Sequence, residues 1–208
     1  MESDSIPIGK GIRDAPPSAP KKLLPAFAIT MKITVLLLVA ILLGASLHGE
    51  DSTAWRRDGK PVDDTSNMKS KKGFGAQLFL TQSPKFFEDW NKPGTPNLNM
   101  LEKAQRNVPL YSIVLFVDPG TDSKGSVDVT YDMVIRKPDG SIYGEQKNAV
   151  GLKGRFVVPA HDLQLAQERM GIQIDSQDPS GTYTVEVTVR DHIKKAELLL
   201  KATFKVAP

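Results

Sequence analysis

Two histidines, His161 and His192, are the residues beyond position 50 with the greatest potential for chemistry. Each has an aspartate beside it, Asp162 after the first and Asp191 before the second. A histidine paired with a carboxylate can act as a general base, and histidine is a common zinc ligand. The spacing matches no helical His-x-x-x-His pair, and the chain contains no Gly-x-Ser-x-Gly element and no phosphate-binding glycine loop. Surface histidines in turns are the preferred interpretation, and a hydrolase or metal-dependent enzyme using His161 and His192 is the alternative.

The other groups that could support metal or covalent chemistry are few. The chain has no cysteine, which excludes disulfides, thiolate zinc sites, a cysteine nucleophile and a lipidated cysteine. Asp118, Asp122 and Asp128 lie close together in the sequence, with Gly120 and Gly125 between them, but their spacing differs from the calcium-binding EF-hand loop. They are interpreted as turn-forming aspartates. We therefore expect no catalytic residue, no metal and no cofactor.

Three aromatic residues, Phe86, Phe87 and Trp90, form the candidate interaction surface. They follow Ser83-Pro84, a favourable helix start, and the spacing i, i+1 and i+4 places all three on one helical face. In one interpretation this helix plugs an open end of the fold with Trp90 buried. In the other, the aromatic face and the proline-rich loop after it dock a peptide, a glycan or a partner protein. A second short helix is expected at 100–106.

The elements that must position these residues are mostly β-strands. Apolar and polar residues alternate strictly in three long stretches, and a fourth, 111–117, is apolar on both faces and suits a central strand. Glycine and proline turns separate the stretches, and long helical patterns are absent. The expected strands are 76–82, 111–117, 127–136, 141–147, 155–158, 170–175, 182–190 and 197–206. The sequence thus predicts an all-β, antiparallel sandwich of about seven to eight strands, with a short helical insertion between the first two.

The run Asp178-Pro179-Ser180-Gly181-Thr182-Tyr183-Thr184-Val185 resembles the corner before the penultimate strand in bacterial secreted immunoglobulin-like and fibronectin type III-like domains. The resemblance extends over about 73–208, without the cysteine pair of antibody domains. It implies an immunoglobulin-like sandwich in which Gly181 and Tyr183 form a structural corner. Tyr183 would be buried there, with its hydroxyl reaching backbone across the corner. The resemblance assigns no functional residue, because this fold hosts many functions.

The first part of the chain reads as a leader. Residues 33–43 are an uncharged apolar run, preceded by Met31-Lys32 and followed by small residues, which predicts a signal peptide over 31–49. An uncleaved anchor is the alternative, although the run is short for a membrane span. Residues 1–30 are expected to be an unstructured extension or a mis-assigned start. The polar segment 50–72 is expected to be a flexible linker, so that the folded domain covers 73–208.

The charge distribution restricts the class of partner. Residues 1–49 hold five basic and three acidic residues, so the chain from Glu50 onward has a net charge near +1. Its lysines and arginines are interspersed with acids, which excludes the basic stripe of a nucleic-acid-binding protein. The membrane is expected to be a partner only through the signal sequence during export.

These observations favour a non-enzymatic binding or accessory module of the bacterial cell envelope. We expect a periplasmic or secreted protein that contacts an envelope protein or polysaccharide through loops or a sheet edge. A structural spacer in the envelope is a further alternative.

Overall fold

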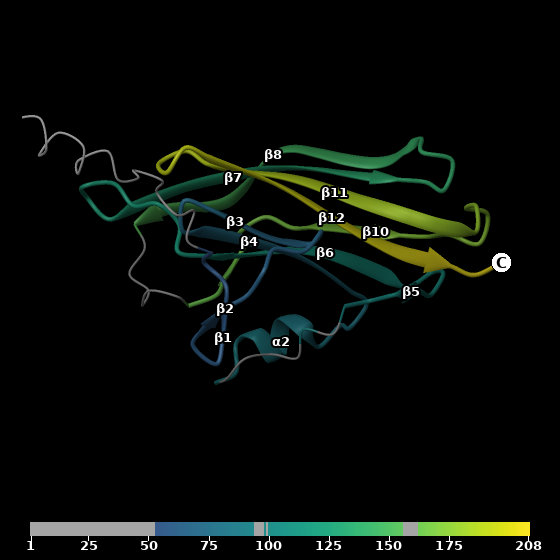
Figure 1. The fold of residues 1–208 in the computed structure, drawn as a ribbon. Helices are drawn as coiled ribbons and strands as arrows, with labels where there is room; N and C mark the ends of the chain where they lie inside the picture. The colour runs from purple at the N-terminus through teal and green to yellow at the C-terminus, as the bar shows by residue number, and fades with distance from the viewer. Residues whose placement is uncertain (1–52, 94–97, 99, 156–161) are drawn as a thin grey trace, which may run out of the picture. The chain divides into compact units, whose positions relative to one another are not determined.

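The computed structural model describes residues 53–93, 98, 100–155 and 162–208. The expected extension and signal peptide, residues 50–52 and residues 156–158 of an expected strand lie outside the described residues. The described part folds into two five-stranded sheets and a separate two-stranded hairpin, β1 (Arg56–Arg57) and β2 (Lys60–Pro61) (Figure 1). None of its helices combines the length and apolar character needed to cross a bilayer.

The first sheet is centred on β6, the segment that is apolar on both faces. Its strand order is β10-β6-β4-β3, with β9 beside the later part of β6. Central placement follows from sequence, because only a strand covered on both faces gains from apolar residues at every position. The strands are β3 (Met68–Lys71), β4 (Phe74–Thr81), β6 (Pro109–Val117), β9 (Gln164–Leu165) and β10 (Met170–Gln173).

The second sheet holds the alternating stretches in the order β5-β12-β11-β7-β8. Burial in β7, β11 and β12 alternates residue by residue, so one face packs inward and the other faces solvent. Every pairing in the described sheets is antiparallel except the short parallel contact of β5 with β12. The strands are β5 (Lys103–Ala104), β7 (Ser126–Arg136), β8 (Ile142–Arg155), β11 (Gly181–Asp191) and β12 (Ala196–Val206).

The inward faces of the two sheets share one hydrophobic core. Its large, fully buried side chains come from both sheets, and include Leu78, Phe116, Tyr131, Tyr183 and Phe204. Eight strands of four or more residues occur in the described part. The prediction of an all-β sandwich with a short helix after its first long strand is confirmed.

Backbone hydrogen bonds join the two sheets along their sides. Near β9, the N–H groups of Gln167 and Glu168 donate to the carbonyls of Gly151 and Val150, at 2.8 and 3.0 Å. On the opposite side, Lys201 donates to the carbonyl of Ser66 at 2.7 Å. The outer strand β8 also has register shifts at three places along its pairing with β7. Bulges and covering segments protect strands from edge-to-edge association, so in the described residues the irregular strand β8 is poorly suited to pair with a partner strand.

Residues 53–72, expected to be a flexible linker, are part of the folded unit. Trp55 is only 8% exposed, and its indole N–H donates to the carbonyl of Lys69 at 3.0 Å. Its ring lies against Gly75, where an added β-carbon would come within 2.9 Å of the indole. The linker prediction was wrong because the few apolar residues of this segment, among them Trp55 and Met68, pack together with Val117 of β6.

The short helix α2 (Phe86–Trp90) lies on the outer face of the first sheet (Figure 1). It follows β4, as predicted, but Lys85 rather than Ser83 occupies the N-cap, without a side-chain cap. The helix therefore covers a sheet face and does not plug an open end. The second helix expected at 100–106 is absent from the described residues, because that segment contains the extended strand β5.

Candidate functional site

The outer face of the first sheet carries the three aromatic residues singled out from the sequence. Phe86 is their anchor: it is 4% exposed, and its ring stacks 5.4 Å from that of Phe79 on β4. Ile113 and Leu115 of β6 complete this small cluster. These β6 residues alternate with those that enter the main core, so the helix packs on the opposite side of the sheet.

Phe87 and Trp90 remain half-buried, and the structure adds Tyr111 to them. The rings of Phe87 and Tyr111 meet edge to face with centroids 5.3 Å apart. Tyr111 in turn covers Gly171 of the neighbouring strand β10, where an added β-carbon would lie 3.3 Å from the tyrosine ring. Glycine at this position therefore lets the tyrosine lie flat against the sheet.

Arg169 is the charged member of this group. Its guanidinium lies 4.5 Å from the centroid of the Phe87 ring, while the residue itself stays exposed. Such cation–π stacking holds a guanidinium in place without using its N–H donors. We call Phe87, Trp90, Tyr111 and Arg169 the aromatic surface. Sequence reasoning missed Tyr111 and Arg169, because no local pattern reports that residues 24 and 82 positions from Phe87 lie beside it.

Two charges at the end of the helix are paired with each other. The Lys92 ammonium lies 2.7 Å from the Asp89 carboxylate, and this hydrogen bond and charge raise the pKa of Lys92. No ion pair to Arg169 is found within the described residues. Chemically, the aromatic surface offers apolar area beside one accessible cation, an arrangement suited to binding.

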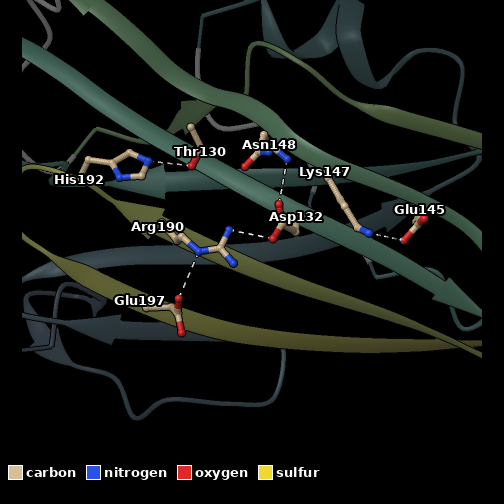
Figure 2. Close-up of polar contacts among 8 residues, drawn as sticks. All are labelled: Thr130, Asp132, Glu145, Lys147, Asn148, Arg190, His192 and Glu197. Carbon is tan, nitrogen blue, oxygen red and sulfur yellow. Dashed lines mark hydrogen bonds and ion pairs between the residues drawn. The ribbon is translucent and has the colours of Figure 1, made fainter.

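The outer face of the second sheet carries a network of polar side chains (Figure 2). Arg190 on β11 lies between the carboxylates of Asp132 on β7 and Glu197 on β12, at 2.8 and 3.2 Å. The backbone N–H of Asn148 on β8 also donates to Asp132 at 2.8 Å. The network thus ties four neighbouring strands together, and Lys147 pairs with Glu145 within β8 at 3.4 Å.

The pKa values in this network follow its contacts. The hydrogen bond from the Asn148 backbone, followed by the hydrogen bond and charge of Arg190, lowers the pKa of Asp132. The same partnership raises the pKa of Arg190. Both groups are held in their charged forms by each other, which is the property of a structural ion pair rather than of an acid–base catalyst.

Among the described residues, no catalytic group is assembled around His192. Its Nε2 lies 2.8 Å from the Thr130 hydroxyl, on the exposed surface (Figure 2). The neighbouring Asp191 does not orient the imidazole, because its buried carboxylate accepts hydrogen bonds from the backbone N–H groups of Gly120, Ile193 and Lys194. His161 lies outside the described residues.

Asp122, in the loop before β7, stabilises the backbone of that loop. The Asp122 carboxylate accepts hydrogen bonds from the N–H groups of Lys124 and Ser126, both at 2.8 Å, and these bonds lower its pKa. No group of three or more histidine, aspartate or glutamate side chains suited to a metal occurs in the described part of the chain.

The structural corner implied by Gly181 and Tyr183 lies at the start of β11, away from the aromatic surface. Tyr183 is fully buried, its ring stacks on Phe204 at 5.2 Å, and its hydroxyl donates to the carbonyl of Pro179. Gly181 has φ +133°. Both residues therefore act in the architecture.

Comparison with known proteins finds no matching family model and no matching curated protein. Among solved structures, the chain is similar to a family 123 glycoside hydrolase from Clostridium perfringens, with a TM-score of 0.37 and 14% identity. That alignment covers 64% of this chain and 27% of the hydrolase, so the chain spans about a quarter of its length. A Niemann-Pick type C2 protein from Japanese carpenter ant gives a TM-score of 0.31 and 9% identity, covering 63% of this chain and 89% of that one. At these scores neither similarity bears on function.

Proposed function

We propose that this protein is a non-enzymatic binding module of the bacterial cell envelope, and that it contacts a partner protein through the aromatic surface. The observation that carries the proposal is the placement of Phe87, Trp90 and Arg169. The helix α2 holds Phe87 and Trp90 half-buried on a sheet face where Phe86 is the buried anchor, and Arg169, just before β10, lies over the Phe87 ring. Aromatic residues and arginine are the side chains most enriched at the energetic centres of protein interfaces.

A partner protein fits this surface better than a polysaccharide. Sugar rings stack on flat aromatic faces, whereas one face of Phe87 is occupied by Arg169 and its edges contact Phe86 and Tyr111. The joined sides of the sandwich also favour a surface on a sheet face over strand addition at an edge. The proposal therefore places binding on this face.

Location and family complete the proposal. The apolar run at 33–43 would direct export to the periplasm or beyond, with cleavage before the folded part. The Tyr183 corner supports membership among the immunoglobulin-like or fibronectin type III-like sandwiches of secreted proteins. Export without cysteine is compatible with a bacterial envelope.

The test is a quantitative pull-down from envelope extract with the exported protein as bait. Trp90→Ala and Phe87→Ala are compared with wild type, and Thr203→Ala on the outer face of the second sheet is the matched control. Thermal unfolding first establishes that each variant is folded. We expect one protein to be retained by wild type and Thr203→Ala and lost from both aromatic variants.

Four outcomes would overturn the proposal. Equal retention by all four baits would place binding elsewhere on the molecule. Sedimentation with purified envelope polysaccharide, lost in Trp90→Ala, would assign the surface to a glycan. A hydrolase activity of the purified protein that disappears in His192→Ala would establish an enzyme, and retention of no specific partner would leave the spacer function.

A further inference from the structure

We infer that the partner presents an acidic residue next to an apolar one, and that Arg169 receives the carboxylate. This inference rests on the proposed function and specifies the chemistry of its partner. Its starting point is the stacking of the Arg169 guanidinium over Phe87 at 4.5 Å. A stacked guanidinium keeps its planar fork of N–H donors directed sideways, the geometry that binds a carboxylate through two parallel hydrogen bonds.

Two acids, Glu168 beside Arg169 in the sequence and Asp89 on α2, already have other partners. The Glu168 carboxylate accepts a hydrogen bond from the backbone N–H of Val150 at 2.8 Å. The carboxylate of Asp89 on α2 is paired with Lys92. Within the described residues, Arg169 is therefore an exposed cation fixed in position by an aromatic ring, without a carboxylate partner of its own.

Apolar contact area lies directly beside this cation. The guanidinium lies over the ring of Phe87, and the rings of Phe87 and Tyr111 meet edge to face. The ring centroid of Trp90 lies 6.0 Å from that of Phe86 on the same helix. A carboxylate bound at Arg169 would therefore bring its neighbouring side chain onto half-buried aromatic rings. Charge complementarity selects an aspartate, a glutamate or a terminal carboxylate, and the rings select an apolar neighbour.

A random dodecapeptide library displayed on phage tests this chemistry with the full exported protein as the target. Wild type and Arg169→Gln are panned in parallel, with Lys205→Gln as a control that removes a cation from the other sheet. We expect wild type and Lys205→Gln to enrich peptides with an acidic residue adjacent to an aromatic or aliphatic one. Arg169→Gln should lose the preference for the acid and keep the preference for the apolar residue.

One enriched peptide is then synthesised, together with a version in which its acid is replaced by the amide. A charge-assisted hydrogen bond at a partly exposed site corresponds to about a tenfold change in Kd. We expect Arg169→Gln to raise the Kd of the acidic peptide about tenfold. The Kd of the amide peptide should stay within about twofold of its value for wild type. Arg169→Lys should restore only part of the loss, because an ammonium lacks the planar fork.

The outcomes separate this inference from the proposed function. Peptides that depend on Trp90 and Phe87 but show no acidic preference would overturn the role of Arg169 and leave the binding surface in place. Peptides unaffected by Trp90→Ala and Phe87→Ala would overturn both. An equal loss of acidic and amide peptides in Arg169→Gln would show that the arginine only supports the Phe87 ring.

Discussion

The hydroxyl of Tyr183 donates a hydrogen bond to the carbonyl of Pro179, four residues earlier, at 2.9 Å. The tyrosine ring is fully buried between Phe204, which it stacks against, and Tyr143, which meets it edge to face. One side chain therefore fixes the chain direction at the entry to β11 while filling the core. The hydrogen bond fixes the conformation of the short loop from Pro179 to Gly181 at the corner before β11.

Substitution of Tyr183 separates these two roles. Tyr183→Phe keeps the ring and leaves the Pro179 carbonyl without its donor, at an expected cost of about 1–3 kcal/mol in the free energy of unfolding. Tyr183→Ala also opens a cavity in the core and should cost about 3–5 kcal/mol. Urea unfolding at pH 7, analysed at constant slope, measures both differences.

Thr184→Ala is the matched control, because Thr184 lies on the same strand and faces outward between Arg136 and Thr203. Its effect should stay within about 0.5 kcal/mol. If Thr184→Ala lowered the free energy of unfolding as much as Tyr183→Ala does, β11 would not have the register found here.

Gly181→Ala tests the turn that leads into this corner. Gly181 has φ +133°, and an added β-carbon would lie 2.8 Å from Cγ of Pro138. Both the backbone conformation and the contact disfavour a side chain, so we expect destabilisation of more than about 1 kcal/mol. Gly144→Ala serves as the comparison, because nothing lies within 4 Å of its β-carbon position. Unfolding midpoints that fall equally in both variants would contradict this account.

The fold could be predicted from sequence in those segments where the residues adjacent in the chain are enough to determine which side chains are buried. The alternation in β7, β11 and β12 reports a half-buried strand by itself, and the Pro-x-Gly-x-Tyr pattern defines the corner locally. β8 was predicted too short, because its register shifts break the alternation between Gly144 and Leu152. Composition failed for residues 53–72, since the burial of Trp55 depends on contacts with Gly75 and Val117 of the first sheet as well as with Val62 and Met68 of its own segment.

The candidate site was accessible only in part. The spacing of Phe86, Phe87 and Trp90 indicated an aromatic helical face, but not the sheet face that it covers. The cation–π contact between Arg169 and Phe87 arises only in the tertiary structure. It depends on the pairing of β10, which follows Arg169, with β6. The Arg190 network likewise requires the register of three strand pairs, which no single strand contains.

Ser112 is a buried residue whose substitution should not destabilise the protein, unlike those of Tyr183 and Gly181. Its side chain is completely buried on β6, and its hydroxyl has no hydrogen-bond partner within the described residues. A buried hydroxyl without a partner carries its desolvation cost uncompensated. Ser112→Ala should therefore leave the protein as stable as wild type or more stable by up to about 1 kcal/mol. Destabilisation beyond about 1 kcal/mol in urea unfolding would show that the hydroxyl is satisfied in solution.

Export predicts a defined start for the mature protein. If a signal peptidase accepts the small residues after the apolar run, the mature chain begins between Leu47 and Asp51. Edman sequencing of the protein recovered from the periplasmic fraction measures this directly. A start at Met1 or Met31 on the exported protein would contradict cleavage, and recovery in the cytosolic fraction would contradict export.

Asp132 links the stability of the second sheet to acid pH. The Asn148 backbone and Arg190 lower its pKa below the usual 3.8, so the folded state favours the ionised carboxylate. A carboxylate whose pKa is lower in the folded than in the unfolded state makes its full contribution to the free energy of unfolding when the pH is above the unfolded-state pKa. The contribution is lost as the pH falls below about 4 and through the lower folded-state value.

Asp132→Asn should therefore destabilise the protein at pH 7 by about 1 kcal/mol, because it removes the ion pair with Arg190 across β7 and β11. Below about pH 3 the difference from wild type should shrink toward zero, since wild-type Asp132 is then becoming protonated itself. Acids outside the Arg190 network titrate equally in both proteins, so the difference reports on Asp132 and the groups paired through Arg190. Glu197→Gln, which removes the longer and more exposed contact at 3.2 Å, should lower stability by less than about 0.5 kcal/mol. A difference between wild type and Asp132→Asn that stays constant from pH 7 to pH 2.5 would show that the ionised carboxylate does not stabilise the sheet.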